Sequence, residues 1–114
     1  MTFVKDSLGE QVKEVKLSGD LGEHPVILTP GSGMSFEMEK YMRRVNPEAD
    51  FPAVRILELN PEHDAVKALQ RMMTEDPIKA KDLAQILYCQ GLLMADLPLE
   101  DPTAYTKLVC SLMV

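Results

Sequence analysis

The sequence predicts an α+β fold, with a small three-stranded sheet and helices packed on one side or end of it. Two observations lead to this prediction. Three short segments with the composition of strands lie before residue 60, and three helix starts marked by a capping residue and a proline follow from there on. A chain of 114 residues, 46% hydrophobic and 26% charged, fits one folded domain over 1–114. We expect a helix and sheet part over about 1–75 and a pair of helices over about 76–114.

The strands are predicted from short runs of β-branched and aliphatic residues. These runs cover Val12 to Ser18, Pro25 to Thr29 and Val54 to Leu59. Gly19 to His24 predicts the turn that joins the first two, and a short helical turn near Phe3 to Gly9 precedes them. The expected order is therefore helix, strand, strand, helix, strand and three further helices.

A short helix is predicted between the second and third strands, after a loop at Gly31 to Gly33. Ser35 is its expected N-cap, and Asn46 with Pro47 ends it. A stripe roughly 100° wide carries its apolar side chains, namely Met34, Met38, Tyr41, Met42 and Val45. Two interpretations stay open. The stripe belongs to the core, as in most amphipathic helices, or it binds partners, because methionine side chains adapt to varied shapes.

The remaining helices begin where a capping residue precedes a proline. The three pairs are Asn60–Pro61, Asp76–Pro77 and Asp101–Pro102. The capping side chain accepts hydrogen bonds from first-turn amides, and proline at the first helical position loses no bond there. The second of these helices extends to about Ala95. Its far half, ILYCQGLLMA, is apolar nearly all the way round, so we expect it to be buried on two sides.

The last helix carries an apolar stripe that nothing later in the sequence covers. Its members are Tyr105, Leu108, Val109, Leu112 and Met113. Because the sequence stops at Val114, we expect this stripe to be shielded by a second copy of the chain.

Composition argues against several classes of partner. Twelve basic and eighteen acidic residues give a net charge of −6, which opposes phosphate binding, so no nucleic-acid partner is expected. Gln90, Gly91 and Asp96 interrupt the longest apolar stretch, so no membrane span is expected. The N-terminus lacks the apolar core of a signal peptide, which predicts a cytoplasmic protein in which Cys89 and Cys110 are reduced thiols.

The sequence offers little material for catalysis. A small metal-dependent hydrolase would use His63 and Asp64, with His24 as a further ligand, and this stays open as an alternative function. Ordinary structural roles are the more usual ones for such histidines. The cysteines lack Cys-x-x-Cys spacing, and GSG at Gly31 to Gly33 lacks the lysine of a phosphate-binding loop. We therefore expect no catalytic residues, no metal and no cofactor in this chain.

Longer stretches of the sequence resemble a known family. ILELNPEHDAVKAL, LAQILYCQGLLMAD and LPLEDPTAYTKLVCSLMV are similar to the C-terminal domain of the ninety-kilodalton heat-shock chaperones, and most similar to the bacterial HtpG form. The upstream LGEQVKEVKLSGDLGEHPVILTPGSGMSFEMEKYM resembles the opening of the same domain. The likeness covers nearly the whole chain, and ELNPEH followed by EDP is its most specific part.

The resemblance implies a homodimer in which the last two helices of each protomer form a four-helix bundle. The implied dimer-interface residues are Leu83, Leu87, Gln90, Gly91, Met94, Tyr105, Leu108, Val109 and Leu112. Gly91 departs from the alanine that relatives often carry, at an expected cost of about 0.5–1 kcal/mol of helix stability. The chain would then be a homodimerisation module.

The resemblance also implies a role in protein folding and the stress response. The short helix would contact unfolded or partly folded client proteins through Met34, Met38, Tyr41 and Met42. The ATP-binding domain and the middle domain would precede Met1, so this fragment is expected to be no enzyme and to hold no ATP. The acidic tail that recruits helical-repeat co-chaperones is missing, so those partners are not expected. A purely structural dimerisation module, with the short helix packed in the core, is the other alternative.

Overall fold

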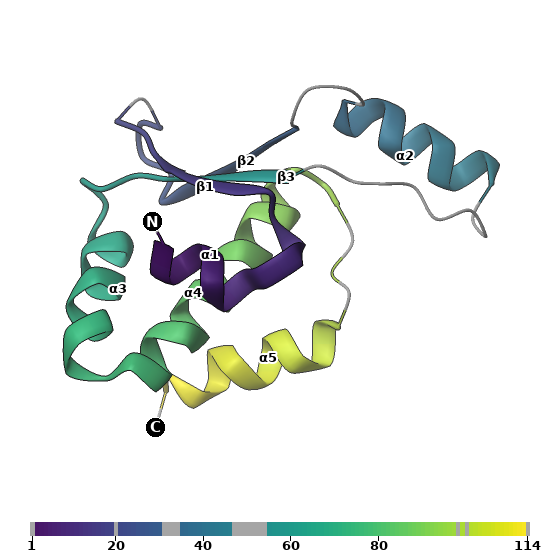
Figure 1. The fold of residues 1–114 in the computed structure, drawn as a ribbon. Coiled ribbons are helices and arrows are strands. Elements are labelled where there is room, and N and C mark those ends of the chain that lie inside the picture. Colours follow the sequence, from purple (N-terminus) through teal and green to yellow (C-terminus); the bar gives the residue numbers. More distant parts are fainter. Residues whose placement is uncertain are drawn as a thin grey trace.

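A three-stranded sheet with helices on one face forms the body of the molecule (Figure 1). The structure is a computed structural model. It describes residues 2–19, 21–30, 35–46, 55–97, 99 and 101–113. The predicted α+β class is confirmed. The predicted loop at Gly31 to Gly33 and the predicted stripe residue Met34 lie outside the described residues.

The sheet consists of β1 (Glu14–Leu17), β2 (Val26–Pro30) and β3 (Arg55–Leu59), as predicted. Its order is β1-β3-β2, so the first two strands in the sequence, β1 and β2, are not neighbours. The central strand β3 runs parallel to β1 and antiparallel to β2. One sheet face is apolar because alternate strand residues point the same way, and it receives the helices.

Five α-helices occur in the described part of the chain. They are α1 (Thr2–Leu8), α2 (Phe36–Val45), α3 (Asp64–Glu75), α4 (Pro77–Met94) and α5 (Pro102–Ser111). A short 3₁₀ turn at Gly9–Gln11 continues α1. Helices α1, α3, α4 and α5 lie on one side of the sheet, and α2 lies apart from them, beyond the sheet (Figure 1). None of the described helices combines the length and apolarity needed to cross a bilayer.

The predicted starts of α4 and α5 are confirmed by their cap hydrogen bonds. Asp76 Oδ1 accepts from the amide of Lys79 at 3.3 Å, and Asp101 Oδ1 accepts from the amide of Ala104 at 3.0 Å. A proline occupies the first turn of each helix. Local sequence therefore sets where both helices begin.

The predicted start of α3 at Asn60 and Pro61 is wrong. The helix begins at Asp64, and its N-cap is His63, whose Nδ1 accepts from the amide of Ala65 at 3.0 Å. The three residues before Asp64 form a turn instead of the first helical turn.

Asn60 is drawn away from the helix by contacts with a distant loop. Its Nδ2 donates to the carbonyl oxygens of Gly22 and His24, at 3.1 and 3.2 Å, and its Oδ1 accepts from the amide of Glu62 at 3.0 Å. The side chain is buried. Asn60 thus ties the loop between β1 and β2 to the end of β3.

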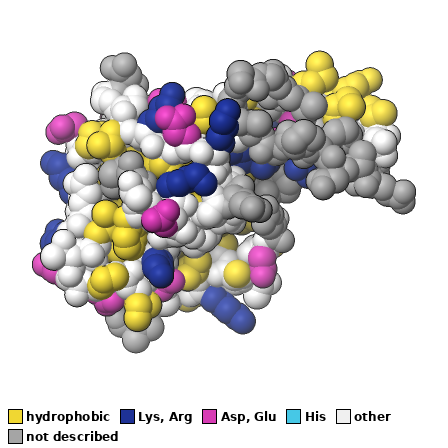
Figure 2. All heavy atoms as spheres, in the orientation of Figure 1, with side chains coloured by type: hydrophobic (Ala, Val, Ile, Leu, Met, Phe, Trp, Pro, Cys, Tyr) yellow, Lys and Arg dark blue, Asp and Glu magenta, His cyan; other side chains and the backbone are white. Residues whose placement is uncertain are grey.

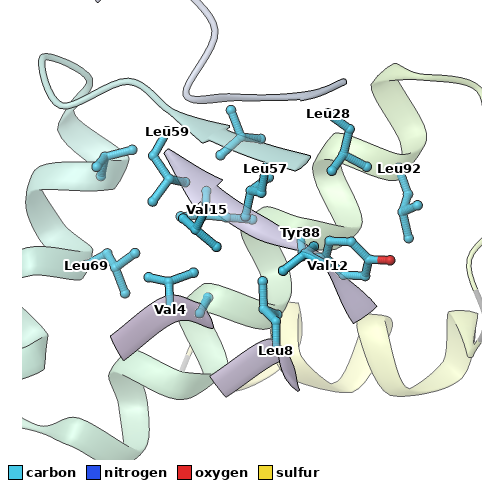
Figure 3. Close-up of a cluster of buried hydrophobic side chains, with 14 of the residues drawn as sticks. Val4, Leu8, Val12, Val15, Leu28, Leu57, Leu59, Leu69, Tyr88 and Leu92 are labelled. Carbon is cyan, nitrogen blue, oxygen red and sulfur yellow. The ribbon is translucent and has the colours of Figure 1, made fainter. Parts of the chain in front are cut away.

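The core lies between the sheet and α4, with α1 and α3 closing its sides (Figure 3). Leu57 of β3 and Tyr88 of α4 are among its largest buried side chains. Gly91 of α4 faces the sheet, where a Cβ atom would lie 3.1 Å from Leu28 Cγ. Its missing side chain lets the helix approach β2 closely, which gives a structural reason for a glycine within a helix.

The far half of α4 was predicted to be buried on two sides, and it is buried on one side only. Its buried positions are Ile86, Leu87, Tyr88, Gly91 and Leu92. Leu93 and Met94 at its end are 51% and 47% exposed. The protomer therefore covers one side of this apolar segment and leaves part of the other side open.

Candidate protein-interaction surfaces

Helix α2 contacts the rest of the protein through a face that carries charge. Glu39 is only 3% exposed, and its Oε2 accepts from Arg55 Nη2 at 2.9 Å. Arg43 Nε lies 3.3 Å from the same oxygen. Phe36, one turn before, packs against the hydrophobic core. Since Arg55 is the first residue of β3, the ion pair joins α2 to the central strand of the sheet.

A second ion pair connects α2 to the segment after α4. Lys40 Nζ lies 3.8 Å from the Asp96 carboxylate and 3.6 Å from that of Glu37. Asp96 and Glu37 are largely exposed, so solvent weakens both pairs and they contribute little to stability. The buried Glu39–Arg55 pair is therefore the main polar attachment of α2.

The apolar side of α2 faces solvent. Met38, Tyr41 and Val45 are 51%, 53% and 63% exposed, and we call these three residues the α2 stripe. Figure 2 shows apolar side chains gathered over this part of the molecule. Met42 is half-buried beside the stripe. For these described residues, the interpretation of the stripe as part of the protomer's own core is therefore wrong. The purely structural alternative loses the core packing of this helix on which it was based.

Helix α5 contributes no buried residue, although its sequence is mostly apolar on one side. It rests on α4, where Cys89 and Leu92 line a cavity of about 110 Å³ together with Tyr105 and Leu108 of α5. Leu112, just after the helix, is 41% exposed. One side of α5 thus meets α4 loosely, and the helix as a whole stays accessible.

Comparison with known proteins identifies the family. Residues 1–114, the whole chain, match the family model described as Hsp90 protein. The chain belongs to the Hsp90 family. It is 37% identical over 111 residues to Chaperone protein HtpG of Shouchella clausii, 36% over 113 residues to that of Oceanobacillus iheyensis and 34% over 111 residues to that of Bacillus subtilis. These alignments cover 97%, 99% and 97% of the chain but 18% of each relative's length.

The residues that the Hsp90 resemblance assigned to a dimer interface fall into two groups. Leu87 and Gly91 face the protomer's own core and sheet, so they are already occupied by intramolecular packing. The other seven are half-buried or exposed. We call these seven the α4–α5 surface, and they are Leu83, Gln90, Met94, Tyr105, Leu108, Val109 and Leu112.

Of the histidines in the alternative hydrolase, His63 has a structural role in this Hsp90-family chain, and His24 makes a contact through its backbone. His63 Nδ1 is engaged by the amide of Ala65, and the carbonyl of His24 accepts from Asn60. Within the described ranges, no group of three or more His, Cys, Asp or Glu side chains is placed to hold a metal ion. No observation on these residues favours the hydrolase.

Sequence reasoning missed Glu39 and Arg55, which set the position of α2. The apolar stripe alone suggests that Glu39 faces solvent. A second pattern was present, since Phe36, Glu39 and Arg43 follow one another at spacings of three and four and so share a helix face. The presence of an aromatic residue, Phe36, on the same face as these charged residues would have indicated that this face contacts the rest of the protein.

Proposed function

We propose that this chain is the C-terminal homodimerisation and client-contact domain of an HtpG-type chaperone. The observation that carries the proposal is that α5 has an apolar side but no buried residue in the single protomer. The relatives named Chaperone protein HtpG support the chaperone part. In this proposal, residues 76–114 supply the dimerisation helices and 1–75 support the client-contact helix α2.

Dimerisation would bury the α4–α5 surface. Met94 and Leu112 remain about half exposed, and Tyr105, Leu108 and Val109 are only partly covered. Burying such side chains stabilises association by about 25 cal/mol per Å² of apolar area. A two-fold axis doubles each contribution because both copies present the same residues. Removal of exposed apolar area is therefore the expected driving force of the dimer.

Client contact would use the α2 stripe and the adjoining Met42. Two thioether side chains and one phenol form a surface that changes shape at low cost, which suits binding to many unlike apolar segments. Two exposed charged residues, Glu37 and Arg44, flank the stripe on the helical projection. The expected binding is weak and non-selective for sequence.

Molar mass by light scattering at micromolar concentration tests the dimer. We expect twice the mass of the 12.8 kDa chain. A well-folded monomer at high concentration would overturn the dimerisation part of the proposal.

Suppression of client aggregation tests the α2 part. The double variant Met38→Ser/Met42→Ser should suppress aggregation less while remaining a dimer. Leu17→Ser, which changes a side chain 50% exposed on β1, is the matched control and should behave like the unmodified chain. Equal suppression by all three proteins would exclude the client role of α2.

The relatives extend well beyond the matched segment, so we propose that ATP binding belongs to a part of them outside it. We expect no ATP turnover by this chain alone, measured as phosphate release at micromolar protein. Turnover that co-purifies with the chain through several columns would contradict this.

A further inference from the structure

We propose that the Glu39–Arg55 ion pair is the positioning element that holds α2 with its apolar stripe toward solvent. This inference rests on the proposed client-contact role of α2 and adds the residues that set its orientation. An amphipathic helix beside an apolar core would ordinarily turn its apolar side inward. Here the side chains that attach the helix are Phe36 and Glu39, Arg43 pairs with Glu39 within the helix, and the stripe faces outward.

The helical projection shows that the two faces oppose each other. Taking 100° per residue, Phe36, Glu39 and Arg43 centre about 160° from the middle of the α2 stripe. The helix therefore cannot contact the protein with both faces at once. Turning the stripe inward would carry Glu39 away from Arg55.

Burial makes that rotation unfavourable. Glu39 is 3% exposed and the Arg55 side chain 10%. Rotation would leave Arg55 without its partner and with little water to replace it, whereas Glu39 would keep Arg43 of its own helix. A buried charge without its partner is strongly disfavoured. The ion pair thus opposes rotation of the helix more effectively than an exposed pair such as Lys40–Asp96 would.

Helix length makes the attachment necessary. The ten residues of α2 are about three turns, which is marginal for a helix without tertiary contacts. Its apolar stripe contributes little packing to the protomer, because its members are half or more exposed. Phe36 and the ion pair therefore supply most of what keeps α2 folded in place.

The test uses Glu39→Gln, which removes the charge and keeps the shape, with Glu37→Gln as the matched control on the same helix. Glu37 has a side chain 88% exposed. We expect amide exchange over residues 36–45 to be at least tenfold faster in Glu39→Gln and unchanged in Glu37→Gln. Exchange in α4 should stay the same in both, which shows that the fold is intact. Equal exchange of residues 36–45 in both variants would overturn the inference.

A single tryptophan gives a second, independent measurement. The chain contains no tryptophan, so Tyr41→Trp reports from the α2 stripe without background. With Glu39 intact, acrylamide should quench this residue as it does an exposed indole. Adding Glu39→Gln should change the quenching constant at least twofold, whereas adding Glu37→Gln should not. An unchanged constant in both would count against the positioning role.

A double-mutant cycle can also distinguish the effect of the ion pair from the effect of general packing. Glu39→Gln, Arg55→Gln and the double variant should give non-additive changes in α2 exchange, because either single change already breaks the pair. Additive changes would contradict the inference.

The outcomes also separate the client role from the positioning role. Faster α2 exchange in Glu39→Gln with normal client suppression by Met38→Ser/Met42→Ser would refute the client role but leave the positioning role standing. Normal exchange in Glu39→Gln with reduced suppression in Met38→Ser/Met42→Ser would refute the positioning role and support the client role.

Discussion

Truncating the most exposed residues of the α4–α5 surface should weaken the proposed dimer by a predictable amount. Full burial of a leucine or methionine side chain contributes about 2 kcal/mol. Leu112 is 41% exposed, so its remaining burial across a dimer is worth roughly 0.8 kcal/mol per copy. The two-fold axis doubles this to roughly 1.6 kcal/mol, or about 15-fold in the dissociation constant.

The same reasoning applies to Met94, which is 47% exposed. The double variant Leu112→Ala/Met94→Ala should therefore weaken the dimer by roughly 3.5 kcal/mol, a few hundred-fold in the dissociation constant. Sedimentation equilibrium over a thousand-fold range of concentration measures both changes. Thermal unfolding of the protomer should move little, because exposed positions contribute little to stability.

Leu17→Ala is the matched control for this experiment. Leu17 is a leucine with similar exposure, 50%, on β1 and outside the α4–α5 surface. The dissociation constant should not change in this variant. If Leu17→Ala weakens the dimer as much as Leu112→Ala, or if neither changes it, the assignment of the dimer to α4 and α5 is wrong.

Three further predictions concern the fold itself, each measured by urea denaturation or amide exchange. Asn60→Ala should destabilise the chain by about 3 kcal/mol, because three part-buried hydrogen bonds of about 1 kcal/mol each are lost; a loss below about 1 kcal/mol would mean that water replaces them. Gly91→Ala should destabilise by about 1 kcal/mol, since contact with Leu28 outweighs the gain in helix propensity, and a stabilised variant would contradict this. Asp101→Ala should cost about 1 kcal/mol of α5 stability and speed exchange at Ala104, and unchanged exchange would argue against the cap.

The features that were predictable from sequence depend on neighbours along the chain. Asp76, Asp101 and Ser35 each cap a helix by accepting from an amide three residues later, so the motif itself contains both partners. The α+β class followed in the same way, from the local composition of strands and helices. Such features require no knowledge of the tertiary structure.

The features that were missed depend on residues far apart in sequence. Asn60 looked like a cap, but its amide group binds carbonyls 38 and 36 positions earlier. The sheet order was not predicted because β3 pairs with both earlier strands, and hydrophobic patterns do not specify pairing. The burial of Glu39 was not predicted because its partner, Arg55, lies 16 positions later. In each case the position of a polar side chain or strand is determined by a partner far away in the sequence, and not by its neighbours along the chain.

The small exposed area of the α2 stripe connects the two proposed roles. Complete burial of the three residues of the α2 stripe would contribute roughly 3 kcal/mol, less than the estimated cost of about 4–15 kcal/mol for bringing two molecules together. One stripe alone is therefore expected to hold a client only briefly. In the proposed dimer the second stripe would bind the same client at high effective concentration, which would raise the overall affinity without any new contact. Client retention should then fall when Leu112→Ala/Met94→Ala separates the protomers, even though Met38, Tyr41 and Val45 are unchanged.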